Sequence, residues 1–132
     1  SGRKAGTPIS EGVSPVAGTD ISTPLAVMKS AAKMNQDIHS GGTLLNIRLG
    51  HELVNTKRGR SSLAAAVLAF FDLGAFHVQF NTLSTETLLD AQAHPENYKD
   101  LLVRVAGYST QFVHLSKTLQ DSIIRRSVHN AF

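Results

Sequence analysis

The chain has 132 residues, of which 42% are hydrophobic and 17% are charged, and its formal net charge is +3. This composition supports a buried core and excludes a disordered chain, and the sequence has no apolar run long enough to cross a bilayer. The absence of cysteine excludes disulfides, thiolate–metal sites and a cysteine nucleophile within this chain. It also fits a reducing compartment, so a cytoplasmic location is expected.

The first twenty residues, "SGRKAGTPISEGVSPVAGTD", contain four glycines and two prolines and do not begin with methionine. We therefore expect residues 1–22 to be an irregular loop from within a longer polypeptide. Thr23 followed by Pro24 predicts a helix start, and the apolar spacing predicts a helix through about Asn35. The "HSGG" at 39–42 breaks the chain before a short strand predicted at 43–50.

The segment "NTKRGR" at 55–60 is interpreted as a loop with solvated charges. The next helix is expected to be capped by Ser61 or Ser62, with Leu63, Val67 and Phe71 on one face, and to end at Gly74. From Phe76 to Ser84 apolar and polar residues alternate, which is the period of a strand. Its polar face carries His77, Gln79 and Asn81, which either contact a ligand or bond to a neighbouring segment.

Ser84 predicts the cap of a further helix with Leu88, Leu89 and Ala93 on its buried side, stopped by His94-Pro95. The run "LLVRV" at 101–105 predicts a strand that leads into a glycine turn, and a last helix begins at Ser116 and ends near Arg125-Arg126. Those two arginines are interpreted as solvated helix-end charges. The alternation of helices with short strands predicts an α/β fold with the glycine loop after the last strand.

No metal site is predicted, because none of the six histidines pairs with another at the i, i+4 spacing. No nucleotide-binding glycine motif is found either. The scattered basic residues lack interleaved aromatic residues, and nucleic acid is not expected as a partner. In "RVAGYS", Gly107 taken alone predicts a tight turn, but a glycine α-carbon can also hold an unpaired electron.

Several stretches, read together, favour the second role. "LLVRVAGYSTQF" resembles the glycyl radical signature at the C-terminal end of the pyruvate formate-lyase superfamily. "LGAFHVQFNTLSTETLLDAQAHPENYKDLLVRVAGYS" is similar to the block that contains this signature, "GRKAGTPISEGVSPVAGTD" to the loop upstream, and "LSKTLQDSIIRR" to the closing helix. The resemblance covers nearly the whole chain, in order, and is closest to the branch of diol dehydratases, choline trimethylamine-lyase and formate-lyase-like proteins.

The resemblance implies that the chain is the C-terminal portion of a glycyl radical α/β barrel, with residues 1–22 the tail of the upstream barrel domain and 23–132 the glycine radical domain. It implies that Gly107 carries the radical. The neighbouring residues would shape the radical loop and shield it from water and oxygen; they are Arg104, Val105, Ala106, Tyr108 and Ser109.

The resemblance also implies partners, and it implies that this chain binds no cofactor, because the iron–sulfur cluster belongs to the activase. A radical S-adenosylmethionine activase with a [4Fe-4S] cluster would remove one hydrogen from Gly107, and the radical would pass to a cysteine in the remainder of the barrel. Because this chain has no cysteine, it would not turn over substrate alone. The implied enzyme is an anaerobic, oxygen-sensitive lyase or dehydratase; the resemblance leaves its substrate open and also allows a homodimer.

Two other functions stay open at this point. A stand-alone subunit could replace an oxygen-cleaved glycyl radical terminus by binding the damaged barrel, although its known relatives have an unrelated N-terminal segment. A small basic binding module is the third candidate, and salt-dependent binding to DNA would support it.

Overall fold

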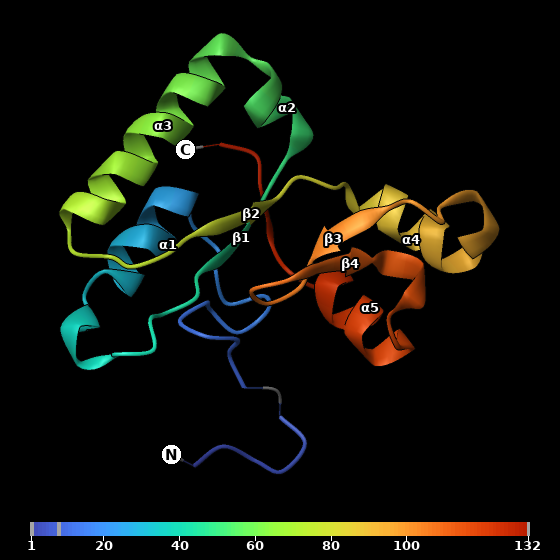
Figure 1. Ribbon diagram of the computed structural model, residues 1–132, viewed down its shortest axis with the longest axis horizontal. Helices are drawn as coiled ribbons and strands as arrows, with labels where there is room; N and C mark the ends of the chain where they lie inside the picture. The colour runs from blue at the N-terminus through green and yellow to red at the C-terminus, as the bar shows by residue number, and fades with distance from the viewer. Residues whose placement is uncertain (1, 8, 132) are drawn as a thin grey trace.

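The computed structural model describes residues 2–7 and 9–131. Mixed helices and short strands form the α/β fold expected from the sequence (Figure 1). The first part contains α1 (Pro24–Ala31), η1 (Gln36–Ile38), β1 (Asn46–Leu49), α2 (His51–Asn55), α3 (Lys57–Asp72) and β2 (Gln79–Asn81). The second part contains α4 (Thr85–Ala93), η2 (Pro95–Asn97), β3 (Leu102–Arg104), β4 (Ser109–Gln111), η3 (Phe112–His114), α5 (Lys117–Ile124) and β5 (Val128–His129).

The central sheet has the strand order β2-β1-β5, and β1 runs parallel to both neighbours. The strands β3 and β4 form a separate antiparallel hairpin, in which Val103 lies opposite Thr110. Figure 1 shows α1 and α3 on one side of β1 and β2, and the hairpin with α4 and α5 on the other. The sheet therefore lies between two helical groups.

Each helical group has its own apolar core. The first is formed by buried residues of α1, β1 and α3 and by Leu45 just before β1; it includes Met28 and Phe70. The second is formed by α4, β3, η3 and α5, and includes Leu88, Val103 and Phe112. Between the two cores lies Arg48 of β1, which is 2% exposed and donates to the backbone carbonyls of Leu83, Ile124 and Arg126. A buried arginine thus joins the two groups through backbone hydrogen bonds.

The helix caps agree with the sequence at several points. Thr23 caps α1, Ser84 caps α4 through the Thr87 N–H, and Ser116 caps α5. Gly74 follows α3 with a φ of +85°, the left-handed conformation expected of a glycine at that end. However, α1 ends at Ala31, several residues before the expected Asn35.

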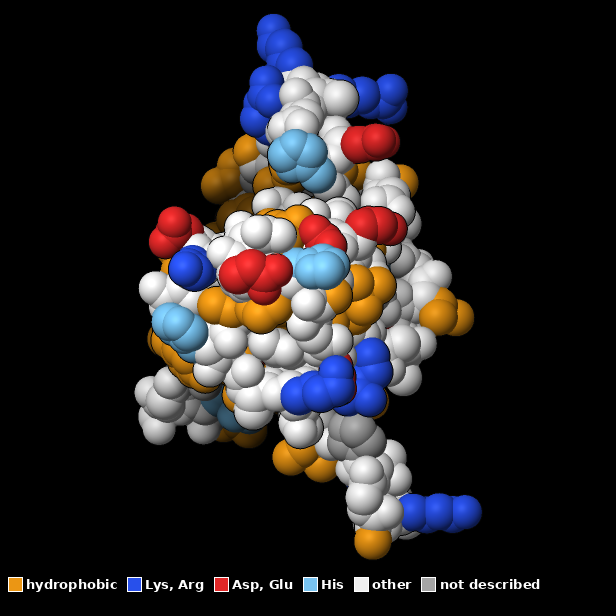
Figure 2. Space-filling model, turned by 90° about the vertical axis from the view of Figure 1, so that its right-hand side faces the viewer, with side chains coloured by type: hydrophobic (Ala, Val, Ile, Leu, Met, Phe, Trp, Pro, Cys, Tyr) orange, Lys and Arg blue, Asp and Glu red, His pale blue; other side chains and the backbone are white. Residues whose placement is uncertain are grey.

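The interpretation of 55–60 as a loop was wrong. These residues end α2 and begin α3, and Thr56 caps α3 instead of Ser61 or Ser62. The reason is Gly59, where a Cβ would lie 1.6 Å from the Leu53 carbonyl oxygen, so that only glycine lets the two helices approach. The basic side chains of this segment are exposed, and Figure 2 shows them at the end of the molecule where α2 meets α3.

The buried residues of α3 and α4 differ in part from the apolar face expected for α3 and from the buried side expected for α4. In α3 the buried residues are Ala66 and Phe70, whereas Phe71 is 45% exposed. In α4 Leu88 and Ala91 are buried, while Leu89 and Ala93 are exposed. The strands β4 and β5, which follow the glycine turn, were not predicted. Within the described ranges 2–7 and 9–131, no helix is long and apolar enough to span a membrane.

Candidate functional site

Gly107 lies at the tip of the β3–β4 hairpin. The turn runs from Val105 to Tyr108, and the Val105 N–H donates to the Tyr108 carbonyl at 2.9 Å. Gly107 is the third residue of this turn and has a φ of +76°. Because side chains disfavour this left-handed region, a glycine is the natural residue at this position of a turn. The tight turn expected from the sequence is confirmed.

The loop is shielded only at its base. Val105 is 4% exposed and belongs to the second apolar core, and Ala106 is half-buried beside it. In contrast, Gly107, Tyr108 and Ser109 are exposed. Because the tip extends beyond both apolar cores, this chain alone does not shield Gly107, and the shielding role of its neighbours stays a prediction.

An open groove runs beside Gly107, and glycine backbone forms much of its wall. Gly12 and Gly42 line it with φ values of +56° and +80°, together with Leu44, Phe76, His77 and Arg104. A Cβ on Gly12 would lie 2.3 Å from the Leu44 carbonyl oxygen, and a Cβ on Gly42 would lie 2.7 Å from the Phe76 ring. At these two positions close packing requires glycine. Contacts within the chain, to Leu44 and Phe76, therefore explain these two glycines.

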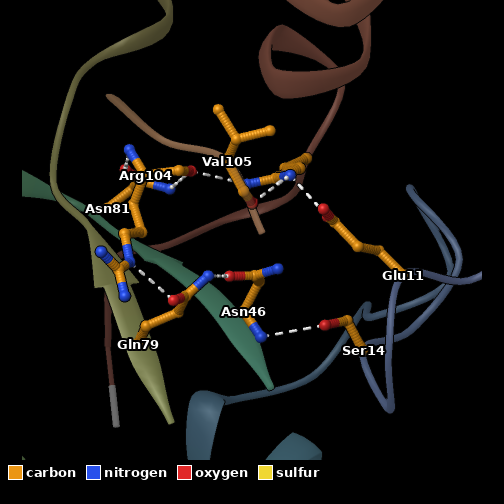
Figure 3. Close-up of polar contacts among 8 residues, drawn as sticks. Glu11, Ser14, Asn46, Gln79, Asn81, Arg104 and Val105 are labelled. Atoms are coloured by element: carbon orange, nitrogen blue, oxygen red, sulfur yellow. Dashed lines mark hydrogen bonds and ion pairs between the residues drawn. The ribbon is translucent and has the colours of Figure 1, made fainter. Parts of the chain in front are cut away.

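Arg104 connects the hairpin to the central sheet (Figure 3). Its backbone N–H donates to Asn81 Oδ1 at 2.9 Å, and Asn81 Nδ2 donates to the Arg104 carbonyl at 2.9 Å. Its Nε donates to Gln79 Oε1 at 2.8 Å, and its Nη1 donates to Ser109 Oγ at 3.3 Å. The sequence left open whether the polar face of β2 contacts a ligand or bonds to a neighbouring segment. Gln79 and Asn81 bond to a neighbouring segment, the β3–β4 hairpin.

This polar network continues from β2 to β1 and to Ser14. Gln79 donates from Nε2 to Asn46 Oδ1, and the Asn46 N–H donates to Ser14 Oγ at 2.9 Å. Two buried nitrogen atoms in the described part of the chain lack a hydrogen-bond partner, Asn46 Nδ2 and His77 Nδ1. The segment around Ser14 is thereby bonded to β1, which pairs with β2, the strand that bonds to the hairpin.

Arg126 holds the base of the loop from the other side. Its Nη1 donates to the Arg104 carbonyl at 3.3 Å, and its Nη2 donates to the Val105 carbonyl at 3.0 Å and to Glu11 Oε2 at 2.5 Å. The interpretation of Arg126 as a solvated charge was wrong, since only 15% of its side chain is exposed. Burial lowers the pKa of its guanidinium, and the Glu11 carboxylate opposes this shift.

The expected loop residues thus divide into two groups. Arg104 and Val105 form the bonded base, whereas Ala106, Tyr108 and Ser109 surround the tip. Sequence reasoning missed Glu11 and Arg126 as a pair, because they lie 115 positions apart and no local pattern connects them. Within residues 2–7 and 9–131, no group of three or more histidine and acidic side chains could hold a metal ion.

Comparison with known proteins identifies a family whose matched region includes the Gly107 turn. The family model described as "Glycine radical" matches residues 9–113, a range that includes Gly107. Trans-4-hydroxy-L-proline dehydratase of Clostridioides difficile is 49% identical over 127 residues, which are 96% of this chain and 16% of the relative.

Two solved structures are similar throughout. The glycerol-bound form of the B12-independent glycerol dehydratase from Clostridium butyricum has a TM-score of 0.94 and 43% identity, over 98% of this chain and 16% of that one. A structure described for 1,2-propanediol dehydration in Roseburia inulinivorans has a TM-score of 0.92 and 47% identity, over 97% of this chain and 16% of that one. The chain therefore spans about 16% of the length of these relatives.

Proposed function

The chain belongs to the glycine radical family, and from this premise we propose that Gly107 carries a glycyl radical, a post-translational modification of its α-carbon. An α-carbon radical is stabilised by the amide nitrogen on one side and the carbonyl on the other, provided that the centre is planar. A side chain would crowd that plane, and glycine has none. The observations that carry the proposal are the family match over residues 9–113 and the position of Gly107 in a tight hairpin turn, where its φ is +76°.

We propose that the chain is part of a glycyl radical dehydratase or lyase. A dehydratase is favoured because the relatives described above are named for dehydration. The chain has no cysteine, so the thiol that receives the radical would belong to the remainder of the barrel. That remainder would also cover the exposed tip and exclude oxygen. The division into residues 1–22 as barrel tail and 23–132 as radical domain belongs to this proposal.

The second proposed partner is the activase, a radical S-adenosylmethionine enzyme with a [4Fe-4S] cluster. It would break one Gly107 Cα–H bond, take up the hydrogen atom and leave the unpaired electron on carbon. We further propose a cytoplasmic location and an assembly into homodimers, which light scattering of the whole enzyme would test.

Anaerobic activation followed by electron paramagnetic resonance tests the site. The wild-type enzyme is expected to show a doublet split by one α-hydrogen, and Gly107→Ala is expected to lose it. Gly74→Ala is the matched control, because Gly74 also has a positive φ and has no atom within 4 Å of an added Cβ. A doublet that survives in Gly107→Ala would show that the radical lies elsewhere.

A further inference from the structure

The direction of the radical loop depends little on apolar packing at its tip. A Cβ added to Gly107 would find a single neighbour within 4 Å outside the adjacent residues, Leu44 Cδ1 at 3.5 Å. Tyr108 is 50% exposed and Ser109 is exposed. Within this chain, the contacts that set where the tip points are therefore mainly the hydrogen bonds at the base of the hairpin.

Arg126 makes the bonds closest to the turn. Its guanidinium donates to the carbonyls of two consecutive residues: Arg104, which directly precedes the turn, and Val105, the first residue of the turn. Consecutive carbonyls of a straight strand point to opposite sides. One side chain can reach both only where the strand bends, and β3 does end at Arg104. The guanidinium thus holds the bend that aims the tip.

Arg126 is itself fixed from two directions. Glu11 accepts from Nη2 at 2.5 Å, and its side chain is 35% exposed. The backbone carbonyl of Arg126 accepts from Arg48 Nη1 at 3.4 Å, and Arg48 is anchored in β1. A planar guanidinium with several donors can serve two carbonyls and a carboxylate at once, which a lysine ammonium on a flexible stem does less well.

We propose that Arg126, held by Glu11, is a positioning residue that aims the Gly107 loop at the cysteine of the barrel. This inference rests on the proposed function. In the transfer, the thiol S–H bond breaks, the hydrogen atom bonds to Gly107 Cα, and the unpaired electron remains on sulfur. Such a step requires close contact between the two atoms, and a displacement of about 1 Å is enough to slow a reaction about 100-fold.

The test uses the whole enzyme that contains this chain, activated anaerobically, and measures spins per polypeptide and turnover per spin separately. Arg126→Met is expected to keep the Gly107 doublet but to lower turnover per spin about 100-fold. Arg126→Lys and Glu11→Gln are expected to lower it less. Arg125→Met is the matched control, because Arg125 is the adjacent arginine and is exposed, and it is expected to match the wild type.

The two readouts separate positioning from stability. A merely structural defect lowers spins and turnover together and leaves turnover per spin unchanged, and that result would overturn the assignment of Arg126. If Arg126→Met fails to fold, the measurement is made on Arg126→Lys instead. A wild-type turnover per spin in Arg126→Lys would then overturn the assignment of Arg126 as a positioning residue. Failure of the proposed function has a different signature, a doublet that persists in Gly107→Ala.

Discussion

Replacing Gly107 with alanine is expected to change stability only slightly. A non-glycine residue in the left-handed conformation is disfavoured by about 1–2 kcal/mol, and the lower freedom of alanine in the unfolded chain offsets about 0.4–1 kcal/mol. The Leu44 Cδ1 contact at 3.5 Å is ordinary van der Waals contact and adds no clash. The expected net loss in the free energy of unfolding is therefore about 1 kcal/mol.

Gly12→Ala gives the matched comparison, measured with Gly107→Ala by urea denaturation of this chain. Gly12 also has a positive φ, but its Cβ would lie 2.3 Å from the Leu44 carbonyl oxygen, which accepts from the Val13 N–H at 2.9 Å. That bond must shift, so we expect a loss of about 3 kcal/mol or more. Equal losses in the two variants, or a loss above about 3 kcal/mol for Gly107→Ala, would refute this account of the loop.

Three further perturbations test the fold around the site. Arg48→Met leaves three part-buried backbone carbonyls without this donor and is expected to lower the free energy of unfolding by about 1–3 kcal/mol in urea denaturation. A loss below about 0.5 kcal/mol would contradict the role of Arg48 between the cores. Gly59→Ala is expected to separate α2 from α3, seen as faster amide exchange in both helices, and unchanged exchange would count against it. Glu86 has a pKa lowered first by its backbone hydrogen bond and then by Ser84. The ionised Glu86 therefore stabilises the fold above its unfolded pKa, and this stabilisation is lost as the pH falls through its lower folded pKa. Glu86→Gln is expected to make the melting temperature depend less on pH in the acid range. The same slope of melting temperature against pH in the variant and the wild type would refute this.

Local signals predicted much of the fold. Threonine or serine before an apolar run correctly gave the caps of α1, α4 and α5, because a cap depends on residues within one turn. The alternation in β2 and the turn at Gly107 were predicted for the same reason. The start of α3 was missed because Gly59 was read as a loop residue, whereas it is a contact point between two helices.

The rest of the site depends on distant pairs. The two-residue strand β5 forms only because β1 lies beside it, and no periodicity can indicate so short a strand. The role of Arg126 depends on Glu11 and on carbonyls more than twenty positions away. The exposure of the hairpin tip in this chain could not be predicted either, because it depends on which residues the two apolar cores cover. The sequence therefore indicated the glycine and its turn but not the side chains that hold them.

The most direct measurement of the central claim is the spectrum of activated enzyme in which glycine carries deuterium at the α-carbon. If the unpaired electron resides on Gly107, the doublet of the unlabelled enzyme collapses, because deuterium splits the signal far less than hydrogen. A doublet of unchanged splitting in the labelled enzyme would contradict the assignment of the radical to a glycine.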